Sequence, residues 1–253
     1  MKEVFFVEFI GMRRLLSHVR RCVDDYNMIA EGDKIAVGVS GGKDSLTLLA
    51  ALHDLAIFYP NHFTLCAITV DMGFEGADFS EIRTFCENLG IEYRVIPSDL
   101  GNLLFNIRKE KNPCSLCAKM RRGMLNEAAK EAGCNKVALG HHFDDLVETF
   151  MLNLIHEGRI GAFLPVTYLD RTDITVIRPM ALVPEKYVRY FTSKNTLPVY
   201  TNPCPADKHT ERETAKQLVA DLERAHKGFK HRVFGAMQKA DVDGWKVKNN
   251  DEK

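Results

Sequence analysis

Short apolar runs alternate with longer helical patterns between residues 34 and 158, and this alternation restricts the fold more than any other feature of the sequence. Four runs have the length and composition of buried strands: residues 34–40, 64–71, 93–98 and 136–142. Each is followed by a helical pattern: residues 44–59, 78–90, 114–133 and 144–158. Strands that alternate with helices form a parallel sheet covered by helices on both faces. The sequence therefore predicts an α/β fold, which binds ligands beyond the carboxyl ends of its strands.

Helical patterns also flank this core. Residues 12–29 place Leu15, Val19 and Val23 at helical spacing among arginines and aspartates, which predicts an amphipathic helix. Beyond Gly158 the pattern loosens, and three further elements are predicted: a strand at residues 174–180, a helix from Glu185 and basic helices from Glu211 onward.

The composition sets the compartment that we expect for this protein. Lys and Arg together number 34, as do Asp and Glu, so no overall positive charge marks a nucleic-acid-binding protein. No stretch approaches the roughly 20 apolar residues of a membrane span, and we expect no membrane association. Seven cysteines without a convincing signal peptide indicate a cytoplasmic location and metal or thiol chemistry rather than disulfides.

A glycine-rich loop, GVSGGKDS, joins the first predicted strand to the next helix. It is not a Walker A loop, because only three residues separate Gly38 from Gly42, and Asp44 stands where a hydroxyl would reach magnesium. Its glycines let backbone N–H groups approach an anion, and the start of the helix adds partial positive charge. The loop resembles the Ser-Gly-Gly-X-Asp-Ser motif of the PP-loop ATP pyrophosphatases, which cleave ATP between the α and β phosphates and transfer AMP. The resemblance implies an ATP-binding phosphate loop made of Ser40, Gly41, Gly42, Lys43, Asp44 and Ser45.

The resemblance also implies where the rest of the nucleotide lies. The second strand ends in Val70, Asp71 and Met72, where these families place the adenosine. Gly140, at the end of the fourth strand, is expected to border the nucleotide as well. Taken alone, Asp71 would more often be an acid that ends a strand, and the glycine turn a simple helix cap.

Three of the seven cysteines lie in segments suited to metal binding. Cys114 and Cys117 stand three apart at the start of a predicted helix, where they share a face, and Cys204 lies between two prolines. Their spacing leaves open a zinc site with His209, as well as a redox pair. The other four fall in helices, a strand or a turn, and are expected to pack as small apolar side chains: Cys22, Cys66, Cys86 and Cys134.

A histidine and aspartate cluster, GHHFDD, follows the fourth predicted strand at the sheet edge that carries the phosphate loop. Paired carboxylates there can hold Mg²⁺ or accept a proton from an activated nucleophile. We therefore expect Asp44, Asp144 and Asp145 to be catalytic. The competing interpretation is that Asp144 or Asp145 only caps the next helix, while His141 and His142 are polar surface residues.

In combination, these motifs resemble the tRNA 2-thiocytidine synthetase family, the sulfur-inserting branch of the PP-loop enzymes. The matching stretches span roughly residues 20 to 205: DYNMIAEGDKIAVGVSGGKDSLTLL, CSLCAKMRRGML, ALGHHFDDLVETFMLNL, VIRPMALVPE and Cys204. The resemblance implies a 4Fe–4S cluster on Cys114, Cys117 and Cys204, with one iron left to deliver hydrosulfide. It further implies that ATP adenylates the C2 oxygen of an anticodon-loop cytidine, that sulfur displaces AMP, and that Mg²⁺ offsets the phosphate charge.

This resemblance sets the expected organisation and partners. We divide the chain into an N-terminal helical segment (1–30), a PP-loop ATP pyrophosphatase domain with the iron–sulfur site (31–205) and basic C-terminal helices (206–253). The expected partners are tRNA, a sulfur donor, either a cysteine desulfurase or inorganic sulfide, and a second copy of the chain. Arg13, Arg14, Arg20 and Arg21 could contact tRNA phosphates or form a solvated face.

Three alternatives stay open at this level. A lysidine-synthetase-like ligase would share the loop and the tRNA but need no cluster. A zinc enzyme would carry sulfur as a persulfide on Cys204 or Cys114, and a sensor would bind nucleotide and cluster without catalysis. The stretch CPADKH departs from the family, because it lacks a frequent further cysteine and with it a spare thiol for relaying sulfur. The chain also lacks the terminal zinc-binding Cys-x-x-Cys pairs of related 2-thiouridine enzymes, which favours the cytidine branch.

Overall fold

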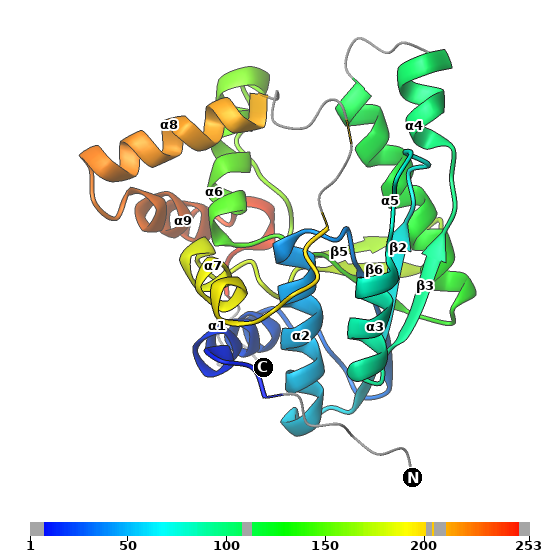
Figure 1. Cartoon of the computed structure of the whole chain (residues 1–253). Coiled ribbons are helices and arrows are strands. Elements are labelled where there is room, and N and C mark those ends of the chain that lie inside the picture. The colour runs from blue at the N-terminus through cyan, green and yellow to red at the C-terminus, as the bar shows by residue number, and fades with distance from the viewer. Residues whose placement is uncertain (1–7, 108–112, 201–203, 205–210, 248–253) are drawn as a thin grey trace.

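A six-stranded sheet forms the centre of the computed structural model, which describes residues 8–107, 113–200, 204 and 211–247 (Figure 1). Its strand order is β3–β2–β1–β4–β6–β5. The strands are β1 (Asp33–Gly38), β2 (Phe63–Val70), β3 (Glu92–Ile96), β4 (Lys136–Ala138), β5 (Val166–Leu169) and β6 (Ile174–Ile177). The helices are α1 (Met12–Asp25), α2 (Lys43–Phe58), α3 (Ser80–Asn88), α4 (Leu100–Asn102), α5 (Pro113–Glu131), α6 (Phe143–Leu152), α7 (Glu185–Lys194), α8 (Glu211–Ala225) and α9 (Phe229–Lys239). Two π-helical turns, η1 (Leu103–Ile107) and η2 (Asn153–Glu157), and one 3₁₀ turn, η3 (Val242–Gly244), complete the described elements.

The sheet is parallel except at one edge, which confirms the predicted α/β fold. Strand β1 pairs in parallel with β2 and β4, and β3 and β6 extend the sheet on either side. Strand β5 pairs antiparallel with β6 and was not predicted. It returns through the short turn at residues 170–173, as antiparallel pairing allows. Its four residues include the exposed Tyr168, so an edge strand of this kind carries little apolar signal.

Helices cover both faces of the sheet, and the alternation along β1 shows why. Ile35 and Val37 pack with α1, α2, α6 and α7, whereas Ala36 packs on the opposite face with Leu125 and Ala129 of α5. Successive side chains of a strand point to opposite faces. A strand covered on both sides must therefore be apolar at successive positions, which explains the continuous apolar runs in the sequence.

The C-terminal helices pack against the core of the domain. Val219 of α8 and Phe234 of α9 belong to the same buried cluster as the helices on the α2 face of the sheet. Trp245 is fully buried, and its Nε1 donates a hydrogen bond to the carbonyl of Phe163 at 2.8 Å. Tyr26 donates its hydroxyl to the carbonyl of Trp245 at 3.0 Å, so the residue that follows α1 and the residue that follows η3 meet in one core. Within the described residues, no helix is both long and apolar enough to cross a membrane.

The four cysteines expected to pack as apolar side chains are all buried, which confirms that prediction: Cys22, Cys66, Cys86 and Cys134. Burial raises the pKa of the Cys22 and Cys86 thiols to about 12. These thiols therefore stay protonated at neutral pH and do not behave as nucleophiles.

Candidate active site

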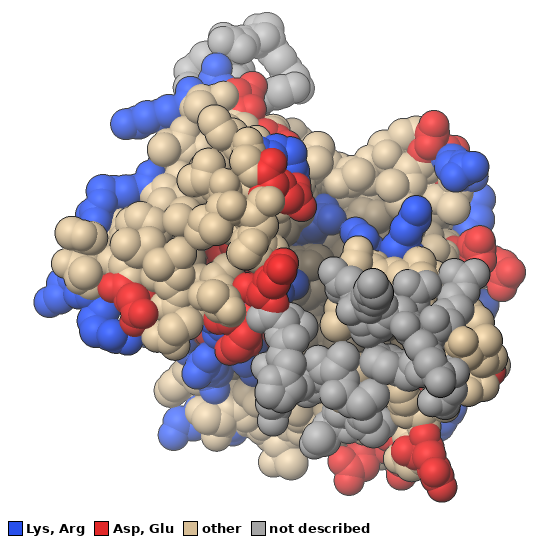
Figure 2. All heavy atoms as spheres, turned by 90° about the horizontal axis from the view of Figure 1, so that it is seen from above, with Lys and Arg blue, Asp and Glu red and all other residues tan. Residues whose placement is uncertain are grey.

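A cavity of about 640 Å³ lies at the carboxyl ends of β1, β4 and β6. Its walls come from the segment after β1, from residues 139–141, from Arg178 and from helices α5, α6 and α8. Figure 2 shows the molecule from the top of Figure 1. The surface there is hollowed between two raised parts, and Lys and Arg side chains lie in the hollow. Both the position and the size are those of a ligand site in an α/β sheet.

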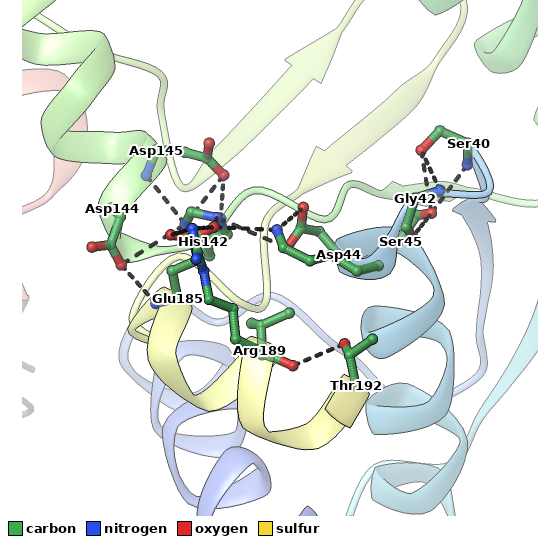
Figure 3. Close-up of polar contacts among 12 residues, drawn as sticks. Ser40, Gly42, Asp44, Ser45, His142, Asp144, Asp145, Glu185, Arg189 and Thr192 are labelled. Carbon is green, nitrogen blue, oxygen red and sulfur yellow. Dashed lines mark hydrogen bonds and ion pairs between the residues drawn. The ribbon is translucent and has the colours of Figure 1, made fainter. Parts of the chain in front are cut away.

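The phosphate loop (residues 40–45) turns sharply between β1 and α2. Gly41 has a φ of 82°, and a Cβ there would come within 2.7 Å of the Tyr200 side chain, so only glycine fits. The N–H of Ser40 donates to Ser45 Oγ at 3.2 Å, and this hydroxyl donates to the carbonyl of Gly42 at 2.9 Å (Figure 3). The turn and the first turn of α2 together form a site for an anion at a helix N-terminus.

Lys43 pairs with Asp44 and with Glu185 of α7, so a charged cluster links α2 to α7. Figure 3 shows Asp44 and Glu185 in this cluster. The Nζ of Lys43 donates to both carboxylate oxygens of Asp44 at 2.8 and 2.9 Å and lies 3.3 Å from the Glu185 carboxylate. Burial lowers the pKa of Lys43, but the hydrogen bond to Asp44 and the charge of Asp44 outweigh this effect. The pKa of Lys43 is therefore raised. Burial also disfavours ionised Glu185, but the hydrogen bond from Arg189 and the charges of Lys216 and Lys43 lower its pKa to about 2. Both groups are therefore charged at neutral pH.

Asp145 lines the cavity and also caps α6. Its carboxylate accepts from the backbone N–H of His142 at 2.9 Å, while its own N–H donates to Nδ1 of His142 at 3.2 Å. Because Nδ1 accepts, the proton of a neutral His142 ring lies on Nε2, which is 3.8 Å from the Asp44 carboxylate. Arg212 of α8 donates to Asp145 at 3.1 Å and balances its charge.

Asp144 is engaged elsewhere. One of its oxygens accepts from the N–H of Glu185 at 2.6 Å, and the other accepts from Lys230 of α9 at 2.5 Å. It is absent from the cavity walls, whereas Asp44 and Asp145 line them. Asp144 thus joins α6 to the start of α7 and to α9.

The residues expected to hold adenosine lie beside the phosphate loop. Val70, Asp71 and Met72 border a small hollow of about 30 Å³ that shares Ser40, Val70 and Arg121 with the main cavity. Gly140 lines the main cavity, and a Cβ at this position would come within 3.1 Å of the backbone of Asp44 and Ser45. The lack of a side chain at Gly140 therefore lets β4 approach the phosphate loop.

The three cysteines expected to bind metal lie outside the cavity walls, and Cys117 directly precedes Ala118 of α5, which lines them. Cys114 is exposed, while Cys117 and Cys204 are half-buried, and none is in a disulfide. Burial raises the pKa of Cys117, Arg121 opposes this, and the charges of Cys204 and Cys114 add to the increase. Within the described part of the chain, no three His, Cys, Asp or Glu side chains are grouped closely enough to hold a metal ion, and His209 lies outside that part.

Two site residues were missed by the sequence reasoning. Glu185 neutralises Lys43, and Arg178 lines the cavity beside His141 of the predicted histidine and aspartate cluster. Burial, followed by the charges of Arg178 and Arg212, lowers the pKa of His141 to about 3, so the ring is neutral. Arg178 and Glu185 stand in VIRPMALVPE, a stretch that carries the family resemblance, and a charged residue directly after a buried strand was the signal available for Arg178.

The PP-loop domain family matches residues 14–222. The chain is 36% identical over 238 residues to the tRNA-cytidine(32) 2-sulfurtransferase of Geobacter sulfurreducens, which covers 92% of this chain and 91% of that protein. The corresponding protein of Geobacter metallireducens is 37% identical over 235 residues, with the same coverage of both chains. Among solved structures, the U34-tRNA thiolase of Methanococcus maripaludis with its 4Fe–4S cluster superposes with a TM-score of 0.75, at 30% identity over 91% of this chain and 78% of that one.

Proposed function

This chain belongs to the PP-loop family, in the branch of the tRNA-cytidine(32) 2-sulfurtransferases, and on that premise we propose that it catalyses ATP-dependent thiolation of a tRNA base. The favoured substrate is an anticodon-loop cytidine, which would become 2-thiocytidine. One observation carries this proposal. The same cavity is bordered by the phosphate loop on one side and, on the other, by Ala118 and Arg121 of α5, directly after Cys117. A base held there would be close to both an activating nucleotide and a sulfur source.

The phosphate loop and the start of α2 would bind the phosphates of ATP, with the adenosine toward Val70, Asp71 and Met72. Lys43 would exchange part of its contact with Asp44 for a phosphate oxygen. The carboxylates of Asp44 and Asp145, which both line the cavity, provide the hard oxygen ligands that Mg²⁺ prefers. His142, fixed by its capping contact with Asp145, would orient Asp44 through Nε2.

The bound base would react in two steps. Its C2 oxygen attacks the α phosphorus of ATP, the bond between the α and β phosphates breaks, and pyrophosphate leaves. A hydrosulfide sulfur then attacks C2, and AMP departs with the former C2 oxygen. The sulfur loses its proton to a base, for which the cavity wall offers the carboxylates of Asp44 and Asp145. A carbonyl oxygen is a poor leaving group until it carries phosphate, which is why ATP is needed.

The thiols of Cys114, Cys117 and Cys204 suit an iron–sulfur cluster. Soft thiolates are the ligands that such clusters prefer, and three of them leave one iron for another ligand. A single zinc ion needs each thiolate at about 2.3 Å, whereas cysteines on a cluster bind different irons and stand farther apart. The charges of Cys204 and Cys114 both act on Cys117, which supports a metal site shared by these three residues. When bound, the cluster would supply the sulfur through its open iron.

The test is product formation by protein purified without oxygen. The protein is incubated with ATP, Mg²⁺, sulfide and tRNA from a strain that lacks 2-thiocytidine, and nucleosides are analysed by mass spectrometry. We expect 2-thiocytidine to form together with AMP and pyrophosphate, and both to depend on RNA. If 2-thiouridine forms instead, the base is wrong while thiolation stands. If pyrophosphate release is independent of RNA and no thiolated nucleoside forms, the proposed function is wrong.

A further inference from the structure

The cavity is larger than the phosphate loop and the adenosine residues require, and its other half is lined differently. Residues that follow β4 and β6 wall this half, with Thr149 of α6 and Arg212 of α8 beside them. His141, Phe163 and Arg178 lie there. We call it the β6 half of the cavity. The side chains of the β6 half belong neither to the phosphate loop nor to the residues expected to bind adenosine, so the binding of ATP at those two places assigns them no role.

Arg178 is firmly held in the β6 half. Its side chain is buried, with the whole residue only 8% exposed. Nη1 donates to the carbonyl of Leu164 at 2.6 Å and lies 3.4 Å from Thr167 Oγ1, and the guanidinium carbon stands 5.1 Å from the centre of the Phe163 ring. The Nε atom is buried and has no hydrogen-bond partner within the described residues. One edge of the guanidinium is thus fixed, and its remaining donors are left for something else.

Among the residues that the structure describes, no negative charge balances Arg178. Its pKa is lowered to about 10 by burial and then by the nearby charge of Arg122, and no carboxylate contributes. Arg212, the other arginine at this wall, already has Asp145 as its partner at 3.1 Å. His141 is neutral and supplies no charge of either sign at physiological pH. Among the described residues, Arg178 therefore leaves the β6 half with unbalanced positive charge, and the nearby Arg122 of α5 adds a second cation to the cavity wall.

A buried cation without a partner lowers stability, because its lost hydration is not replaced. The hydrogen bond to the Leu164 carbonyl alone does not require a charged side chain. A buried guanidinium with no carboxylate partner in the described part of the chain, such as that of Arg178, is typical of a site that binds an anion. A guanidinium has parallel donors that match two oxygens of a phosphate group, which a lysine cannot do.

We propose that Arg178 is the centre of a second phosphate-binding subsite in the β6 half of the cavity, with Arg122 as its second cation. Two sources of phosphate fit this chemistry. One is the β and γ phosphates of ATP, reaching across from the phosphate loop. The other is a phosphodiester of the RNA nucleotide whose base enters the cavity, and this second source rests on the proposed function.

The test compares Arg178→Met and Arg178→Lys with Arg159→Met, a control that removes an exposed arginine paired with Glu157. Three quantities are measured: the melting temperature without ligand, the Kd of α,β-methylene ATP and of pyrophosphate, and the Kd of tRNA at several salt concentrations. Arg178→Met should keep or raise the melting temperature, since it removes an unbalanced buried charge. It should raise the Kd of one of the two phosphate ligands at least about tenfold, and Arg178→Lys should raise the Kd of the same ligand less.

The two sources give different results. Loss of affinity for the ATP analogue and pyrophosphate, with tRNA binding kept, assigns the subsite to the triphosphate. Loss of tRNA affinity, with a salt slope shallower by about one, assigns it to the RNA backbone. If both Kd values stay within about twofold of wild type in Arg178→Met, and also in Arg178→Lys should the first variant not fold, the subsite does not exist. Pyrophosphate binding needs no turnover, so this outcome is separable from a failure of RNA-dependent AMP formation.

Discussion

The Nζ of Lys43 donates hydrogen bonds to both carboxylate oxygens of Asp44, to one at 2.8 Å and to the other at 2.9 Å. The two residues are adjacent in sequence at the first turn of α2, so the phosphate loop carries its own internal ion pair. A triphosphate competes with Asp44 for Lys43. Binding of ATP would therefore free the carboxylate for a cation at the moment when the phosphates bring one.

This arrangement predicts that the charge of Asp44 is needed for adenylation. Asp44→Asn keeps the shape of the side chain but should lower RNA-dependent AMP formation at least about 100-fold, a loss typical for one group that stabilises transition-state charge. Iron content should be unchanged, because Asp44 is not a cluster ligand. AMP formation and iron are measured on the same preparation, with Asp221→Asn on the exposed part of α8 as the control. Normal AMP formation by Asp44→Asn would remove this carboxylate from the mechanism.

Gly140 should be intolerant of any side chain. In Gly140→Ala the new Cβ would meet backbone atoms of Asp44 and Ser45 at 3.1 Å, and backbone cannot give way as a flexible side chain can. We expect the affinity for α,β-methylene ATP, measured by calorimetry, to fall about tenfold, which corresponds to about 1.4 kcal/mol.

Gly235→Ala is the matched control for this substitution. Gly235 lies inside α9, and no atom comes within 4 Å of the position that a Cβ would take there, so alanine should raise the free energy of unfolding by up to about 1 kcal/mol. Its ATP affinity should not change. An unaltered affinity in Gly140→Ala as well would mean that the phosphate loop adapts to the added methyl group.

Glu148 should make stability depend on pH. Burial, followed by the charges of Asp145 and Asp144, raises its pKa to about 7 against the opposing charges of Lys216 and Arg212. The folded state thus binds this proton more tightly than the unfolded state, whose pKa is near 4.5. The contribution of this proton to the free energy of unfolding is fully present below about pH 4.5 and is lost as the pH rises toward 7.

Urea unfolding at pH 5 and pH 8 measures this effect. Glu148→Gln should reduce the loss of unfolding free energy between the two pH values by up to about 3 kcal/mol relative to wild type. Glu127→Gln, on the exposed part of α5, should leave that loss as it is. An equal pH dependence in wild type and Glu148→Gln would show that Glu148 ionises normally in the folded protein.

The cysteines should separate into two classes. Cys117→Ser, and likewise the serine variants of Cys114 and Cys204, should lower iron from about four atoms per chain to less than one and abolish thiolation. ATP-analogue binding should persist, because the phosphate loop is built without these residues. Cys86→Ala is the control, since its thiol is fully buried in packing. Iron, sulfide and zinc are assayed in protein purified without oxygen, and a full iron complement in Cys204→Ser would restrict the metal site to Cys114 and Cys117.

The sequence predicted the fold well because burial on both faces leaves a strong pattern. The residues of β1 are apolar at successive positions for the same reason that they are covered by helices on both sides. It also placed the phosphate loop, whose glycine at 41 is imposed by its backbone conformation. The antiparallel edge strand β5 was missed because exposure of one side, as at Tyr168, removes the apolar pattern.

The site was predicted less completely, because contacts between distant segments have no local pattern. Nothing near Asp144 in the sequence indicates that it accepts from Lys230, or that Asp145 pairs with Arg212. Asp145 takes part in the capping box of α6, which confirms that part of the competing interpretation, while catalysis by the acidic pair stays a prediction. The interpretation of His142 as a polar surface residue was wrong, because its side chain is buried.

The arginines of α1 show that a clear sequence pattern can predict a helix without specifying what its charged residues bind. Arg20 and Arg21 lie 3.5 and 3.3 Å from Asp24 and Asp25, so part of the charge of this helix is balanced on the helix itself. Contact of Arg13 and Arg14 with tRNA stays a prediction.

The backbone N–H of Tyr200 donates to the carbonyl of Gly41 at 2.9 Å. A Cβ at Gly41 would also come within 2.7 Å of the Tyr200 side chain, so residue 200 packs on the same turn to which its backbone is bonded. The conformation of residue 200 is therefore linked to that of the phosphate loop, although the two lie about 160 residues apart in the sequence.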